Sequence, residues 1–111
     1  MADAETELGK GEILQASEKA WGAVAHYVKS VAMDEGWECR THRQVNRAAR
    51  RLIRLTDDHV LNGIRLGAAN ALHQNFYEDW FAEDQVADSL NGVRELLSAM
   101  RVARERLSND P

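Results

Sequence analysis

The chain has 111 residues, of which 44% are hydrophobic and 29% charged, and its net charge is −4. This composition is typical of a globular protein with a single domain over residues 1–111, and it argues against a fibrous or disordered chain. The single cysteine, Cys39, excludes an intramolecular disulfide. The acidic start of the chain is unlike a signal peptide, and no apolar run approaches the roughly 18–20 residues of a membrane span. We therefore expect a cytoplasmic protein without a membrane partner.

The first part of the chain predicts two helices. The only proline is the last residue, so long stretches are free of helix breakers and favour an all-α fold. Residues 2–9 predict a short helix that ends at Gly9 or Gly11. Over 12–33, apolar residues recur every three or four positions, which predicts a second helix. Gly36 is then available for a left-handed cap.

Two capping patterns place the next helices. Thr41 followed by Gln44 is a capping box, which predicts a helix over 41–55. The acidic segment 56–58 supplies caps for a helix over 58–80. Within that helix a small-residue stripe repeats every four positions, and we expect a neighbouring helix to approach it closely; its members are Gly63, Gly67 and Ala71.

The last predicted helix, 83–107, carries an apolar seam in alternating steps of four and three residues. The seam consists of Val86, Leu90, Val93, Leu97, Met100 and Leu107. Arg104 interrupts it. Such a seam suits antiparallel packing within a bundle or a homodimer interface. Together the elements predict a compact antiparallel bundle of four to five helices, and the small size of the domain favours a homodimer.

The charge is unevenly distributed, and the basic block forms one side of a helix. Residues 1–39 and 57–93 are acidic, whereas 40–56 contain six arginines and no acid. At 100° per residue these arginines fall within an arc of about 100°, opposite an aliphatic face. We call this set the arginine ridge: Arg40, Arg43, Arg47, Arg50, Arg51 and Arg54.

The arginine ridge permits more than one interpretation. Arginine forms bidentate contacts with phosphate, so the ridge is a candidate surface for RNA or nucleotide. Alternatively it meets an acidic partner protein, or the protein's own acids neutralise it, such as Glu78, Asp79, Glu83, Asp84 and Asp88. No aromatic residue interleaves the arginines, which argues against a platform for single-stranded nucleic acid.

The candidates for catalysis lie in the fourth predicted helix. His73 and Tyr77 share a helix face and can act in proton transfer on a phosphodiester, with Arg65 to steady the phosphate. The alternative is a polar contact at the end of a core helix. Cys39 and His42 lack a second pair of ligands, so we expect no metal site. Phosphate-loop and dinucleotide signatures are absent, so no cofactor is expected.

Three segments resemble a known family. ASEKAWGAVAHYVKSVA at 16–32, THR at 41–43 and ALHQNFYEDW at 71–80 are similar to the PaREP family of small, largely archaeal proteins. The resemblance runs from Gly11 to Leu97, in the same order and spacing. PaREP proteins are generally placed near the HEPN (higher eukaryote and prokaryote nucleotide-binding) domains, so the resemblance implies a HEPN-like antiparallel bundle and a homodimer.

The HEPN relatives include several functional classes. Some are metal-independent ribonucleases or toxins paired with nucleotidyltransferase antitoxins, and others are noncatalytic modules that associate with nucleotide or RNA. The ribonucleases carry an arginine four to six residues before a histidine on a late core helix. Here only Arg54 and His59 have that spacing, across a predicted helix junction, and seven residues separate Arg65 from His73. The resemblance thus favours a noncatalytic binding module, with a ribonuclease or an antitoxin-like interaction protein as alternatives.

Overall fold

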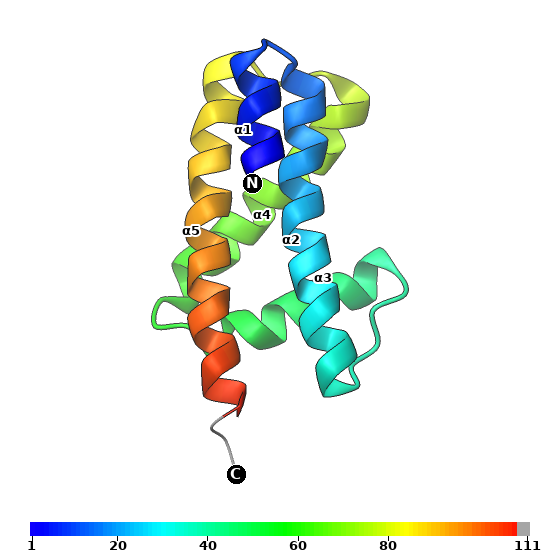
Figure 1. The fold of residues 1–111 in the computed structure, drawn as a ribbon, viewed down its shortest axis with the longest axis vertical. Coiled ribbons are helices and arrows are strands. Elements are labelled where there is room, and N and C mark those ends of the chain that lie inside the picture. The colour runs from blue at the N-terminus through cyan, green and yellow to red at the C-terminus, as the bar shows by residue number, and fades with distance from the viewer. Residues whose placement is uncertain (109–111) are drawn as a thin grey trace.

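The computed structural model describes residues 1–108, and within them the chain forms five helices and no strand. Figure 1 shows α2 and α5 along the long axis, α4 packed against both, and α3 lying across the lower end of the bundle. The expected all-α bundle is confirmed, with α3 crossing it rather than running along it. The helices are α1 (Ala2–Gly9), α2 (Ile13–Glu35), α3 (His42–Ile53), α4 (His59–Glu78) and α5 (Glu83–Ser108).

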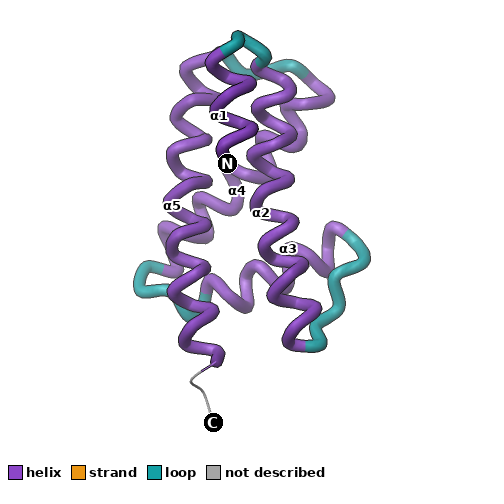
Figure 2. The backbone as a smooth tube through the Cα atoms, in the orientation of Figure 1, coloured by secondary structure: helices purple, strands orange, loops and turns teal. Residues whose placement is uncertain are grey.

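The local signals at the helix ends act as the sequence predicts. Thr41 and Gln44 form the capping box, in which the Gln44 amide donates to the Thr41 hydroxyl at 3.1 Å. Asp58 accepts a hydrogen bond from the Leu61 amide at 3.0 Å and caps α4. Gly36 ends α2 in the left-handed region, with φ 75°. The Gly36 cap ends α2, and the other two caps set where α3 and α4 begin. The short connections between these helices are drawn in Figure 2.

A buried asparagine ends α4 earlier than the periodicity indicates. The Asn75 side chain is 0% exposed, and its oxygen accepts from the amides of Trp80 at 2.7 Å and Phe81 at 2.8 Å. Its amide nitrogen donates to the Ser17 hydroxyl at 3.0 Å. Asp79 adopts a left-handed conformation, φ 53°, which turns the chain toward α5. The side chain thus replaces two helical acceptors and ties the turn to α2.

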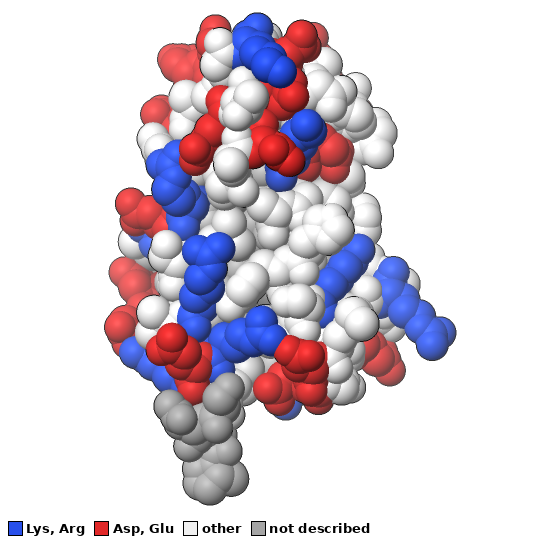
Figure 3. Space-filling view, in the orientation of Figure 1, with Lys and Arg blue, Asp and Glu red and all other residues white. Residues whose placement is uncertain are grey.

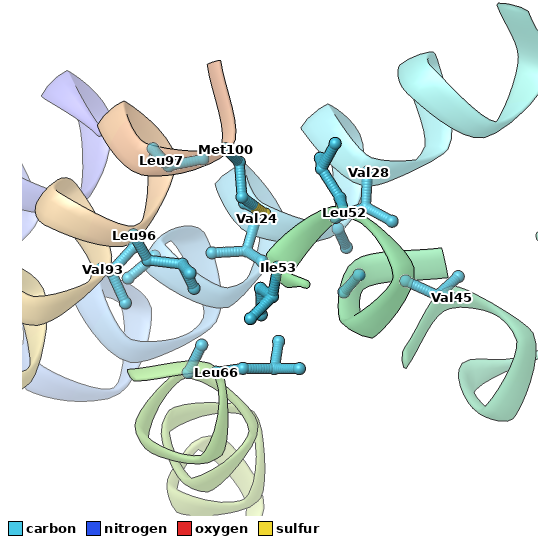
Figure 4. Close-up of a cluster of buried hydrophobic side chains, with 14 of the residues drawn as sticks. Val24, Val28, Val45, Leu52, Ile53, Leu66, Val93, Leu96, Leu97 and Met100 are labelled. Atoms are coloured by element: carbon cyan, nitrogen blue, oxygen red, sulfur yellow. The ribbon is translucent and has the colours of Figure 1, made fainter. Parts of the chain in front are cut away.

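The core lies where α2, α3, α4 and α5 converge. Figure 4 shows Val24, Leu52, Leu66 and Met100, one from each helix, pointing toward one another. Five of the six seam residues of α5 are buried inside the chain, and Leu107 packs against the core at its edge. The seam therefore serves the packing of this bundle. Arg104, which interrupts it, reaches the Asp34 carboxylate on α2.

The small-residue stripe of α4 is not covered, so that expectation was wrong. A Cβ atom built on Gly63 or Gly67 would meet nothing within 4 Å in the described part of the chain. The opposite side of α4 is buried instead, through Asn62, Leu66, Ala69, Leu72 and Asn75. The buried side combines two leucines with two asparagines, whereas Val60 and Ile64 of the same helix are exposed. In residues 1–108, no helix is both long and apolar enough to cross a membrane.

Candidate functional site

The arginine ridge lies on the solvent side of α3. Its six arginines are all exposed, whereas Val45, Ala48, Ala49, Leu52 and Ile53 on the same helix are buried. The helix therefore has the two faces that its sequence predicts. Arg40 precedes the Thr41 cap, and Arg54 follows the last residue of the helix.

The arginine ridge has no acidic partner within residues 1–108. None of its guanidiniums forms an ion pair there, so the acids at 78, 79, 83, 84 and 88 make no salt bridge with it. The acidic blocks flank the ridge in sequence, but the fold directs them elsewhere. Arg51 has a different contact: its guanidinium lies 4.3 Å from the centre of the Trp37 ring.

A groove runs along the arginine ridge toward α4. It encloses about 820 Å³ and is lined by Arg43, Asn46, Arg47, Arg50, Arg51, Arg54 and Asn70. Five of the seven lining residues are ridge arginines, and the other two are neutral hydrogen-bonding amides. An anion in the groove would meet several guanidinium donors and no carboxylate from the lining.

A chain of hydrogen bonds forms the wall between the groove and α2. The Asn70 amide nitrogen donates to the Asn46 side-chain oxygen at 2.8 Å, and the Trp21 indole N–H donates to the Asn70 oxygen at 3.3 Å. Asn46 in turn donates to the His42 carbonyl at 3.1 Å. These contacts fix α3 against α2 and α4. The sequence does not reveal these asparagines because the contact that joins them links two helices.

His73 lies at the other side of this wall, stacked on Trp21. The ring centroids are 4.0 Å apart with an angle of 18° between the planes. The Nδ1 atom of His73 is 3.0 Å from one Glu18 carboxylate oxygen and 3.1 Å from the other. The side chains are 22% and 28% exposed, so this pair lies at the surface of the bundle and not in its core. The edge of His73 also meets the Tyr77 ring, 5.5 Å between centroids.

The Glu18 contact fixes the orientation of the imidazole. With the Nδ1 proton donated to the carboxylate, the Nε2 atom presents a lone pair, and in the described residues no group hydrogen-bonds to it. A carboxylate, an oriented imidazole and a groove of guanidiniums are thus on neighbouring surfaces. Glu18 was missed in the sequence because it is 55 residues from His73.

Arg65 does not join His73 in this arrangement. Its guanidinium donates to Asn62 at 2.9 Å and to Glu95 at 2.7 Å, so it links α4 with α5. Arg54 and His59 stand on either side of the α3–α4 connection, as predicted. Within the described residues, no group of three or more histidine, cysteine or acidic side chains is placed to hold a metal ion.

Comparison with known families identifies a family model that covers most of the chain. The model of the archaeal PaREP1/PaREP8 family matches residues 1–97. That range contains the arginine ridge, the groove and the Glu18–His73 pair. No match was found among curated proteins or among solved structures.

Proposed function

The chain belongs to the archaeal PaREP1/PaREP8 family, and we propose that this member binds RNA through the arginine ridge. The observation that carries the proposal is the set of exposed guanidiniums without a carboxylate partner in residues 1–108. Like charges three and four residues apart repel by a few tenths of a kcal/mol per pair. A bound polyanion removes that repulsion and releases counterions, which makes binding favourable and dependent on salt.

The spacing of the arginine ridge suits a phosphate backbone. From Arg43 to Arg54 the helix rises by about 16 Å, and each four-residue step by about 6 Å. That step is comparable with the separation of neighbouring phosphates along one strand. The groove supports the same proposal, because its amides from Asn46 and Asn70 add neutral donors beside the guanidiniums.

The test is a binding titration with a labelled RNA oligonucleotide at several salt concentrations. We expect wild-type affinity to fall steeply with salt, and Arg47→Gln with Arg50→Gln and Arg54→Gln to weaken binding at low salt by about a hundredfold. The slope of log affinity against log salt should decrease by about three. Arg94→Gln with Arg106→Gln is the control with two arginines replaced instead of three, since these arginines contact Glu5 and Asp57.

Two outcomes would contradict RNA binding. One is the absence of any RNA complex with the wild type at low salt. The other is an equal loss of affinity in the control variant, which would show a general charge effect. Either outcome would favour the alternative, an acidic partner protein such as a nucleotidyltransferase of the kind that pairs with some HEPN relatives.

A second candidate function, metal-independent cleavage of RNA, is favoured by the Glu18–His73 pair. In this reaction Nε2 of His73 takes the proton of a ribose 2′-hydroxyl, whose oxygen forms a bond to the adjacent phosphorus. The bond from phosphorus to the 5′-oxygen breaks, and water protonates the leaving oxygen. Because Arg65 is engaged by Glu95, a ridge arginine is the better source of charge on the phosphate.

Wild type and His73→Ala together distinguish RNA cleavage from RNA binding. Wild type in the presence of EDTA should cut RNA, and His73→Ala purified in parallel should bind RNA but not cut it. Glu18→Gln should cut more slowly, because the amide orients the imidazole without the charge. Cleavage that persists in His73→Ala would exclude this mechanism and leave the binding function unaffected.

A further inference from the structure

The tertiary structure brings aromatic rings to the end of the arginine ridge, although none interleaves it in sequence. Trp21 of α2, His42 of α3 and His73 and Tyr77 of α4 form one continuous set of rings, in which His73 contacts the other three and Trp21 also contacts His42. Neighbouring centroids are 4.0 Å apart for Trp21 and His73, 5.1 Å for His42 and His73, and 5.5 Å for His73 and Tyr77. Aromatic rings therefore lie beside the arginines in three dimensions although none lies between them in the sequence. We call these four residues the ring row.

The ring row is continuous with the groove. His42 directly precedes Arg43, the first ridge arginine that lines the groove. Asn70 lines the groove and also accepts the hydrogen bond of the Trp21 indole, so one residue belongs to both surfaces. A strand whose phosphates lie along the arginine ridge thus reaches the ring row without crossing an acidic residue of the groove lining.

The ring row is both accessible and held in place. Tyr77 is 70% exposed, and His42 is exposed as well. Behind them, Trp21 is tied to Asn70 and His73 to Glu18. His73 in turn contacts both His42 and Tyr77 edge-on, and these contacts reduce the conformational entropy that the two exposed rings lose when a flat ligand stacks on them. A stacking site needs exposed rings on a fixed support, and here Tyr77 and His42 are exposed while Trp21 and His73 are held by hydrogen bonds.

From this geometry we infer that the ring row is a subsite for an unpaired nucleobase, with Tyr77 and His42 as the stacking surfaces. This inference rests on the proposed RNA binding and makes it more specific: the substrate is single-stranded. A base in a duplex is stacked on its neighbours and cannot reach the rings, whereas an unpaired base can. Stacking on an aromatic side chain also tolerates any base, so we expect little dependence on sequence.

The experiment compares three RNA probes of equal length: a single strand, a duplex and a single strand with abasic sites. Wild type should prefer the single strand to the other two. Tyr77→Ala should lower its affinity by about tenfold and leave the duplex and abasic probes unchanged. Tyr77→Phe keeps the ring and should retain wild-type affinity, which separates stacking from a role of the hydroxyl. His42→Ala is the second variant and should act in the same direction.

The outcomes separate this inference from the function on which it rests. Equal wild-type affinity for the three probes, or an equal loss for all three in Tyr77→Ala, would overturn the stacking subsite while RNA binding stands. Absence of binding to every probe would overturn both. A loss in Tyr77→Phe as large as in Tyr77→Ala would assign the effect to the hydroxyl and also overturn the inference.

Discussion

The arginines of α3 and four arginines of α4 and α5 are the same residue type on one small protein, yet their surroundings are opposite. On α3 the guanidiniums have no carboxylate partner in the described chain. On α4 and α5, four arginines each reach an acid on another helix or loop, and Figure 3 shows basic side chains beside acidic ones along the α5 edge. The pairs are Arg65–Glu95, Arg94–Glu5, Arg104–Asp34 and Arg106–Asp57.

The comparison separates the arginines into a set paired with acids and a set without such pairs in residues 1–108. Pairs between helices join α5 to α1, α2 and α4, and these arginines serve the fold. The arginine ridge forms no such pair within residues 1–108, and its like charges repel one another, which agrees with the proposed binding of a polyanion. Four changes to the protein test this separation by their effect on the free energy of unfolding, from the largest expected loss to the smallest.

The arginine ridge depends on the apolar face of the same helix. Leu52 is 0% exposed, and we expect Leu52→Ala to lower the free energy of unfolding by about 2–5 kcal/mol. The loss combines transfer of the side chain with the cavity left behind. Urea titration followed by circular dichroism measures it. Val102→Ala is the control, since Val102 is 47% exposed; a similar loss in both variants would contradict the packing described here.

Asn75 is a polar group whose partners are all internal, in contrast to the ridge. Asn75→Ala leaves the amides of Trp80 and Phe81 without their acceptor. We expect a loss of about 2–3 kcal/mol, seen as a lower urea midpoint. Gln74→Ala, at an exposed neighbouring position, should have little effect. An unchanged midpoint in Asn75→Ala would mean that water replaces the side chain at this turn.

The paired arginines should affect stability and not RNA. Arg94→Gln with Arg106→Gln removes two ion pairs at partly exposed positions, where solvent screens the charges. We expect a loss of about 1 kcal/mol or less for both together. RNA affinity should remain within about twofold of wild type. A large loss of affinity with unchanged stability would reverse the assignment of the two arginine sets.

The ridge arginines should affect RNA and not stability. Arg47→Gln with Arg50→Gln and Arg54→Gln removes repulsion worth a few tenths of a kcal/mol per pair, so the urea midpoint should stay the same or rise slightly. The rise should shrink as salt is added, because salt screens the repulsion. A marked drop of the midpoint would show that these arginines stabilise the fold.

Local patterns in the sequence were sufficient for the helices, their caps and the direction of the arginine ridge. The Thr41–Gln44 box, the Asp58 cap and Gly36 act over three or four residues, and the aliphatic face of α3 follows from the helical period. The PaREP resemblance was likewise readable from short strings. The end of α4 was not, because Asn75 holds it through amides in the following turn.

Only the tertiary structure decided how the candidate site is assembled. Glu18 meets His73 across 55 residues, and Asn46 meets Asn70 across 24. The same holds for charge: acidic blocks flank the arginine ridge in sequence, yet the packing of α4 and α5 turns them elsewhere. It holds for the ring row too, whose members come from three helices. Periodicity describes each helix by itself, whereas these contacts depend on which faces the helices bury against one another.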